Sequence, residues 1–65
     1  MDDRILKHLI SKLEELRVDQ AAFVAQGRAA DFAEYRHTCG VIRGLSLAEQ
    51  LCNDLVQRLE TDDDD

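Results

Sequence analysis

Proline is absent from this chain, and glycine and aromatic residues are scarce. The glycines and aromatic residues are Gly27, Gly40, Gly44, Phe23, Phe32 and Tyr35. Ala, Leu, Glu, Gln and Arg are abundant instead, and these residues favour the α-helix. β-Branched residues, which favour strands, are scattered along the chain. The composition therefore predicts an all-α protein and argues against a sheet.

Cysteine is also scarce, which limits how a chain of 65 residues is stabilised. One domain of this size has a small core and usually needs disulfides, a metal ion or a partner chain. Cys39 and Cys52 lie about 20 Å apart if one helix carries both, whereas a disulfide requires Cα atoms within about 7 Å. We therefore expect two reduced thiols, with a disulfide between two chains as the alternative.

The negative charge is concentrated at the C-terminus. Residues 1–61 hold ten acids and eight bases, and the tail at residues 62–65 supplies the rest of the net charge of −6. A nearly neutral body without a basic stripe argues against nucleic acid as a partner. The tail could mimic DNA phosphates, but because its acidity is not spread over a face we interpret it as a solubilising segment.

Long apolar runs are missing as well. No run of about 18 apolar residues occurs, and no charged start precedes an apolar core. We therefore expect no membrane partner and no export signal, and we predict the cytoplasm of a cell as the location.

The first helix is predicted over residues 3–26. Asp2 and Asp3 suit its N-terminus, where free N–H groups and the helix dipole favour carboxylates. Ile5 and Ile10 flank its apolar seam on either side, so the stripe is wider than one facing helix covers and predicts contact with two helices. The seam itself has the 3-and-4 spacing of a heptad pattern and consists of Leu6, Leu9, Leu13, Leu16, Gln20 and Phe23.

A break is predicted at residues 25–31. Gly27 is suited to the left-handed position after a helix end, and Asp31 followed by Glu34 is typical of a helix start. The second helix is predicted over residues 29–60, with a start as early as Arg28 as the alternative. Because the connection is short, the two helices form an antiparallel αα-hairpin.

The second helix carries two apolar seams that are out of phase by one position. The shift falls across Gly40 and Gly44, and such a discontinuity changes the supercoil locally. The first seam is Phe32, Tyr35, Cys39 and Ile42. The second seam is Val41, Leu45, Ala48, Cys52, Leu55 and Leu59.

Gly40, Gly44 and Ala48 form a ridge of small residues at a spacing of four. One interpretation is that another helix approaches this ridge closely, so that dispersion contacts offset the low helix propensity of glycine. Either the first helix or a second chain would then fill it. The other interpretation is a break of the second helix near Gly40, which would give three helices.

Signatures of catalysis and metal binding are lacking. His37 and Cys39 point about 200° apart on a helix, so they cannot share an ion. Glu34 and His37 form a Glu-x-x-His pair, but the additional glutamates of a di-iron bundle are missing. Cys39 lies on the apolar seam without a predicted base. We therefore predict no enzyme, no catalytic residues, no metal site and no cofactor.

The second half of the chain, "DFAEYRHTCGVIRGLSLAEQLCNDLVQRLE" at residues 31–60, resembles short helical proteins of tailed bacteriophages. The features that carry this resemblance are Tyr35–Arg36, then "CGVIRGL", then a leucine-rich end. It implies a phage protein with a role in building or completing the virion, in the cytoplasm of the bacterial host or in the virion itself.

The architecture is similar to the family of the plasmid RNA-regulating hairpin protein Rop, which pairs into a four-helix bundle. That family binds RNA through polar and basic residues of its first helix. Here the corresponding surface mixes acids with bases, which argues against RNA as a partner. The mixed residues are Glu14, Glu15, Asp19, Lys7, Lys12 and Arg17.

These observations predict a non-enzymatic, phage-encoded interaction module that pairs with itself into a four-helix bundle and contacts a larger viral protein. The alternative is a small acidic regulator or inhibitor that binds a host protein or RNA. The predicted helix–helix interface consists of Leu6, Leu9, Leu13, Leu16, Phe23, Gly40, Gly44, Leu45, Ala48, Leu55 and Leu59.

Overall fold

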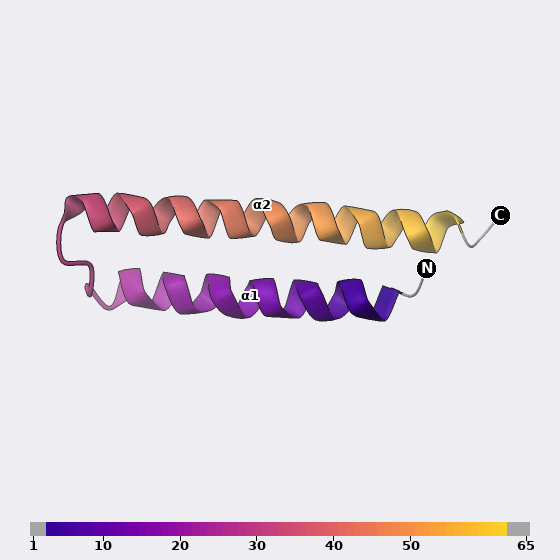
Figure 1. Cartoon of the computed structure of the whole chain (residues 1–65), viewed down its shortest axis with the longest axis horizontal. Coiled ribbons are helices and arrows are strands. Elements are labelled where there is room, and N and C mark those ends of the chain that lie inside the picture. The colour runs from indigo at the N-terminus through magenta and orange to yellow at the C-terminus, as the bar shows by residue number, and fades with distance from the viewer. Residues whose placement is uncertain (1–2, 63–65) are drawn as a thin grey trace.

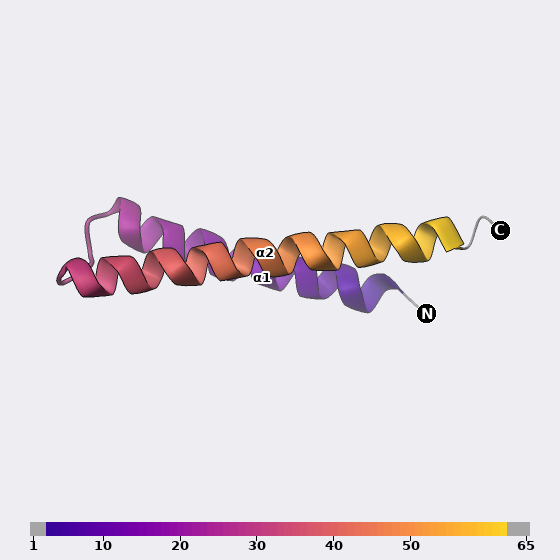
Figure 2. The same ribbon diagram turned by 90° about the horizontal axis from the view of Figure 1, so that it is seen from above.

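The computed structural model describes residues 3–62, which form two helices. Helix α1 spans Asp3–Ala25 and helix α2 spans Phe32–Asp62. The helices run antiparallel and make a rod with dimensions of 52 × 15 × 13 Å (Figure 1). Seen from above, they cross at a shallow angle (Figure 2). The predicted all-α hairpin is confirmed, whereas most of the predicted acidic tail lies outside the described residues.

Helix α2 is continuous through both of its glycines. It runs without interruption for 31 residues, and only Gly27 has a positive φ among the described glycines. The interpretation in which the second helix breaks near Gly40 is therefore wrong. The helix also starts at Phe32 rather than at residues 28–31, because the capping group at Asp31 fixes its beginning.

The end of α1 is a Schellman motif centred on Gly27. The N–H of Gly27 donates to the carbonyl of Val24 at 3.0 Å, and the N–H of Arg28 donates to the carbonyl of Phe23 at 3.2 Å. Gly27 has a φ of 68°, the left-handed conformation that glycine adopts without steric cost and that the sequence predicted here. The Arg28 guanidinium lies 5.6 Å from the centre of the Phe23 ring and reinforces the turn.

The start of α2 is capped by Asp31. Its Oδ1 accepts a hydrogen bond from the N–H of Glu34 at 2.8 Å, which satisfies one of the free donors of the first turn. This N-cap was predicted from the sequence and is confirmed. Together the two caps reverse the chain within residues 26–31 and place the helices side by side.

The core between the helices is thin. In the described part of the chain only Val56 and Thr38 are buried, and Thr38 donates its hydroxyl to the carbonyl of Glu34. The chain exposes 5167 Å², whereas a compact monomer of this mass exposes about 4200 Å². The half-buried residues that line the contact between the helices include Leu6, Ile10, Leu13, Arg17, Gln20, Val24, Val41, Leu45, Glu49, Cys52 and Leu59.

Candidate interaction surface

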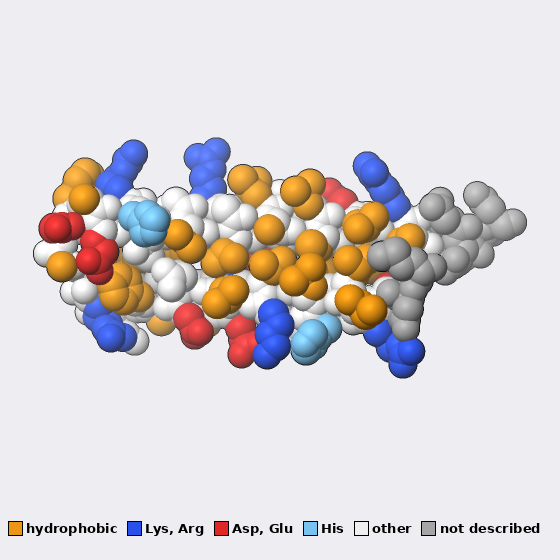
Figure 3. All heavy atoms as spheres, in the orientation of Figure 1, with side chains coloured by type: hydrophobic (Ala, Val, Ile, Leu, Met, Phe, Trp, Pro, Cys, Tyr) orange, Lys and Arg blue, Asp and Glu red, His pale blue; other side chains and the backbone are white. Residues whose placement is uncertain are grey.

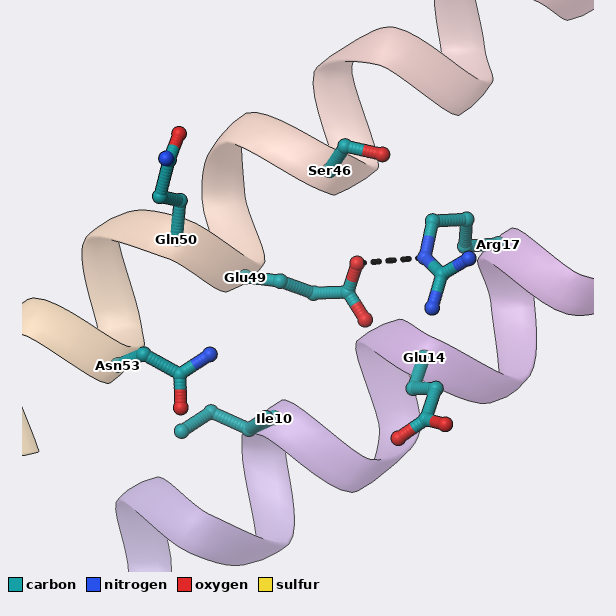
Figure 4. A pocket seen from close by; sticks show the side chains of 7 residues that line it. All are labelled: Ile10, Glu14, Arg17, Ser46, Glu49, Gln50 and Asn53. Carbon is teal, nitrogen blue, oxygen red and sulfur yellow. Dashed lines mark hydrogen bonds and ion pairs between the residues drawn. The ribbon is translucent and has the colours of Figure 1, made fainter.

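One flank of the hairpin is a shallow polar groove crossed by an ion pair. The Arg17 Nε donates to the Glu49 Oε2 at 2.7 Å, and the two side chains reach toward each other from opposite helices (Figure 4). Only 13% of the Glu49 side chain and 34% of the Arg17 side chain are exposed. The other residues that line this groove are Ile10, Glu14, Ser46, Gln50 and Asn53.

The ion pair has a clear structural role. Arg17 sits at an inward position of α1 where the preceding positions carry leucine and isoleucine. A charged pair at such a position favours the register that joins the two partners, because any slip leaves a covered charge without a partner. The groove is thus explained by the registration of the two helices.

A second ion-paired site lies on the same flank near the open end of the hairpin. Lys7 Nζ lies 3.3 Å from Asp3 Oδ2 and 3.6 Å from Glu60 Oε1. The hydrogen bond to the Asp3 carboxylate, its charge and the charge of Glu60 together raise the pKa of Lys7 above its ordinary value of 10.5. This flank of the rod is therefore lined by hydrated, charge-paired side chains.

The opposite flank is apolar and uncovered. A helix turns by about 100° per residue, so Leu9 and Leu16 lie on the side of α1 opposite Lys7 and Glu14. By the same periodicity, Leu51 and Leu55 lie on the side of α2 opposite the groove residue Asn53. Because Glu14 and Asn53 line one groove, the leucines of both helices share the other face.

We call this surface the apolar face. Figure 3 shows hydrophobic side chains gathered across both helices on one side of the rod. The large side chains that define the face are 41% to 76% exposed and are Ile5, Leu9, Leu16, Leu51 and Leu55. Such a continuous, exposed apolar surface on a small protein is typical of an interaction site.

The predicted glycine ridge lies on the apolar face rather than between the helices. Gly40 and Gly44 are exposed, and a Cβ added at either position would meet no atom within 4 Å. The interpretation in which the first helix fills the ridge is therefore wrong, because α1 packs against the neighbouring positions of α2. Close approach of a second chain stays a prediction.

The other predicted interface residues divide into two groups. Leu6, Leu13 and Leu45 are half-buried where α1 and α2 meet, and Phe23, Ala48 and Leu59 are half-buried as well. Leu9, Leu16 and Leu55 are exposed on the apolar face. Leu6, Leu13, Leu45 and Leu59 thus lie within the hairpin contact. A role of the exposed leucines in a contact with another chain stays a prediction.

Sequence reasoning missed several residues of the hairpin contact. Val56 packs there although no predicted seam contained it, and Ile10 packs there although it was predicted only to flank the seam. The signal was the 4-then-3 spacing of Ile10 with Leu6 and Leu13 and of Val56 with Cys52 and Leu59. The inward stripe of α1 lies one position away from the predicted seam and is interrupted by Arg17. The seam with more leucines was preferred, although in the hairpin its Leu9 and Leu16 face outward.

The loop end of the rod carries an exposed aromatic pair. Phe32 and Tyr35 stack with their ring centres 6.2 Å apart, and 73% of Phe32 and 43% of Tyr35 are exposed. Tyr35 also lines a shallow depression together with Arg36, Cys39 and Arg43. The depression also includes Gly40, whereas helix periodicity places Tyr35 on the side of α2 opposite Gly44, so the aromatic pair is a surface apart from the apolar face.

The cysteines and histidines of the described residues lie apart from any cluster of metal ligands. Cys39 and Cys52 are half-buried free thiols, and His8 and His37 are exposed. Within residues 3–62, no group of three or more His, Cys, Asp or Glu side chains is arranged to hold a metal ion. Over the same residues, neither helix has the length and apolarity needed to cross a membrane.

Comparison with protein-family models, with curated proteins and with solved structures finds no match to this chain. The two-helix hairpin agrees with the Rop-like architecture expected from the sequence, and that agreement concerns architecture alone. The resemblance of residues 31–60 to phage proteins stays a prediction.

Proposed function

We propose that this chain is a non-enzymatic interaction module that pairs with a second copy of itself into a four-helix bundle. The observation that carries the proposal is the apolar face, on which large hydrophobic side chains of both helices are exposed. Exposed leucines on one side and paired charges on the other give the rod one side suited to a protein contact.

The exposed area supports the same proposal. The chain exposes 5167 Å², roughly 1000 Å² more than a compact protein of its mass. A standard protein interface covers about 800 Å² on each partner. Pairing through the apolar face therefore supplies a core of the size that the single hairpin lacks.

A second contact surface fits the role of a module that joins its own dimer to something larger. The stacked Phe32 and Tyr35 lie at the loop end and away from the apolar face. They stay accessible when that face is covered, and aromatic side chains are enriched at protein interfaces. We propose that this aromatic end contacts a larger partner protein.

The biological setting that we propose is the virion or the assembly of a tailed bacteriophage. Its support is the resemblance of residues 31–60, including Tyr35–Arg36 and "CGVIRGL". Mass spectrometry of purified particles of the phage that encodes the chain tests this setting. Detection in particles supports it, and absence from particles with early expression favours the alternative, a small acidic regulator of a host protein or RNA.

Self-pairing is tested by sedimentation at micromolar concentration, where we expect a species of twice 7.4 kDa. Replacement of Leu51 by lysine should give a monomer, because a charge on the apolar face would be desolvated in the dimer. Val18→Lys is the matched control, because Val18 is also exposed but lies on the flank of Glu14. A cooperatively melting wild-type monomer would refute the proposal.

A further inference from the structure

The distribution of small and large side chains along α2 points to one specific pairing of two hairpins. Gly40, Gly44 and Ala48 follow each other at intervals of four residues in the half near the loop. Leu51, Leu55 and Leu59 follow at the same intervals in the half near the termini. Gly40, Gly44, Leu51 and Leu55 are exposed, whereas Ala48 and Leu59 are half-buried.

We infer that two copies pair antiparallel, with α2 of one lying along α2 of the other about a two-fold axis between residues 49 and 50. This axis places Ala48 opposite the partner's Leu51 and Gly44 opposite the partner's Leu55. It places Gly40 opposite the partner's Leu59. Each small residue thus receives a leucine, and facing layers that alternate small with large interdigitate without voids.

The position of α1 agrees with the same axis. Ile10 lines one groove with Glu49, Gln50 and Asn53, so the stretch of α1 around Ile10 lies beside residues 49–53 of α2 (Figure 4). An axis that passes between residues 10 and 11 places Ile5 opposite the partner's Leu16. These are the two most exposed apolar side chains of α1 on the apolar face, at 76% and 54%.

Leu9 is matched in the same way. The axis places it opposite the partner's Lys12, whose aliphatic stem covers apolar surface while its ammonium stays in water. The Lys12 side chain is 60% exposed in the hairpin and pairs with Glu15 on its own helix, so its ammonium lies in water. One axis therefore covers the exposed apolar side chains of both helices with residues of the partner.

A parallel pairing is disfavoured by size and by charge. It would place the leucine-bearing half of α2 at the same end in both copies and the glycine-bearing half at the other end, so the distance between the hairpins could not be uniform. It would also bring both acidic C-terminal ends together. The antiparallel pairing separates the C-terminal ends of the two α2 helices by about 35 Å.

This inference rests on the proposed self-pairing. Variants that exchange small and large side chains test the inferred axis separately from self-pairing itself. In the single hairpin a side chain at Gly44 meets no atom within 4 Å, so Gly44→Leu leaves the hairpin intact. Against the partner's Leu55 the added volume should weaken the dimer about tenfold or more. Adding Leu55→Ala on the same chain should restore most of the lost affinity, because it removes the opposing volume in both symmetric contacts.

Leu51→Ala is the matched control for this rescue. It removes the same volume from the same face but should not rescue Gly44→Leu, because the inferred axis places Leu51 opposite the partner's Ala48. The readouts are sedimentation equilibrium for the dissociation constant and circular dichroism for helix content. If the wild type dimerises but Leu51→Ala rescues Gly44→Leu as well as Leu55→Ala does, the inferred axis is overturned while self-pairing stands.

The orientation is measured independently with a spin label. Thr61→Cys, in a chain whose native cysteines are replaced by alanine, carries one label on α2. The inferred axis separates the two labels by about 35 Å along the bundle, at 1.5 Å per residue. A distance near this value supports the inference, and labels side by side at one end would overturn it in favour of parallel pairing. A monomeric wild-type chain would overturn the proposed function itself.

Discussion

The ion pair between Arg17 and Glu49 offers a sharp test of what holds the hairpin in register. We expect Arg17→Met to destabilise the fold, because the substitution keeps the apolar stem but leaves the Glu49 carboxylate, only 13% exposed, without its donor. Losing a hydrogen bond between charged groups typically costs about 1.5–3 kcal/mol. Since Arg17 is 34% exposed, solvent screening places the expected loss toward the lower end, at about 1–2 kcal/mol.

Three further variants separate charge from geometry. Arg17→Gln places an amide nitrogen where Nε now lies, so it should lose less stability than Arg17→Met. The double variant Arg17→Met with Glu49→Leu removes the unpaired charge and should recover most of the loss. Glu15→Gln is the control, because its pair with Lys12 is exposed on both sides and should contribute about 0.5 kcal/mol or less.

The assay is urea denaturation followed by circular dichroism at one fixed protein concentration, with the free energy of unfolding extrapolated to water. Fixed concentration matters because a self-pairing chain gains apparent stability by mass action. If Arg17→Met and Glu15→Gln shifted the free energy of unfolding equally, the covered position of Glu49 would contribute nothing, and our account of the register would be refuted.

Three other predictions concern the turn and the ion pairs, each checked by the same denaturation assay. Gly27→Ala should lower the free energy of unfolding by about 1–2 kcal/mol, because a left-handed φ strains any residue with a Cβ; an unchanged value would show that the turn relaxes freely. Asp31→Ala should cost about 1 kcal/mol and Asp31→Asn much less, because Asn still accepts from the N–H of Glu34; equal losses would contradict the capping role. Lys7→Gln should have a lower free energy of unfolding than the wild type near neutral pH. The difference should vanish as the pH rises through the pKa of Lys7, which Asp3 raises above 10.5, because the ion pair stabilises the fold only while the lysine is protonated. A difference that persists at the highest pH would argue against this ion pair.

The local structure of the hairpin was predictable because short-range chemistry decides it. Gly27 and Asp31 mark the ends of the helices through left-handed geometry and side-chain capping, and both roles are confirmed. The absence of proline and the 3-and-4 spacing of leucines were sufficient for two long helices. These signals act within five residues and need no knowledge of the partner helix.

The packing was less predictable because the apolar stripe of α1 is wider than the surface that α2 alone can cover. The sequence offers a stripe through Leu9 and Leu16 and another through Ile10, and a single helix can cover only one of them. The hairpin covers the stripe that contains Arg17, since Glu49 supplies its partner across the contact. Pairing between distant charges of this kind is invisible to periodicity, which treats every polar residue as outward-facing.

The thin core has a consequence for how the protein behaves in a cell. With only Val56 and Thr38 buried in the described chain, a single hairpin has little to protect its backbone amides from opening. If the second copy supplies the remaining core, the folded fraction depends on how much chain is present, since dilution favours the open monomer that proteases cleave. Abundance then acts as a threshold: chains made in small numbers are degraded, and chains made in a burst persist because they meet one another first.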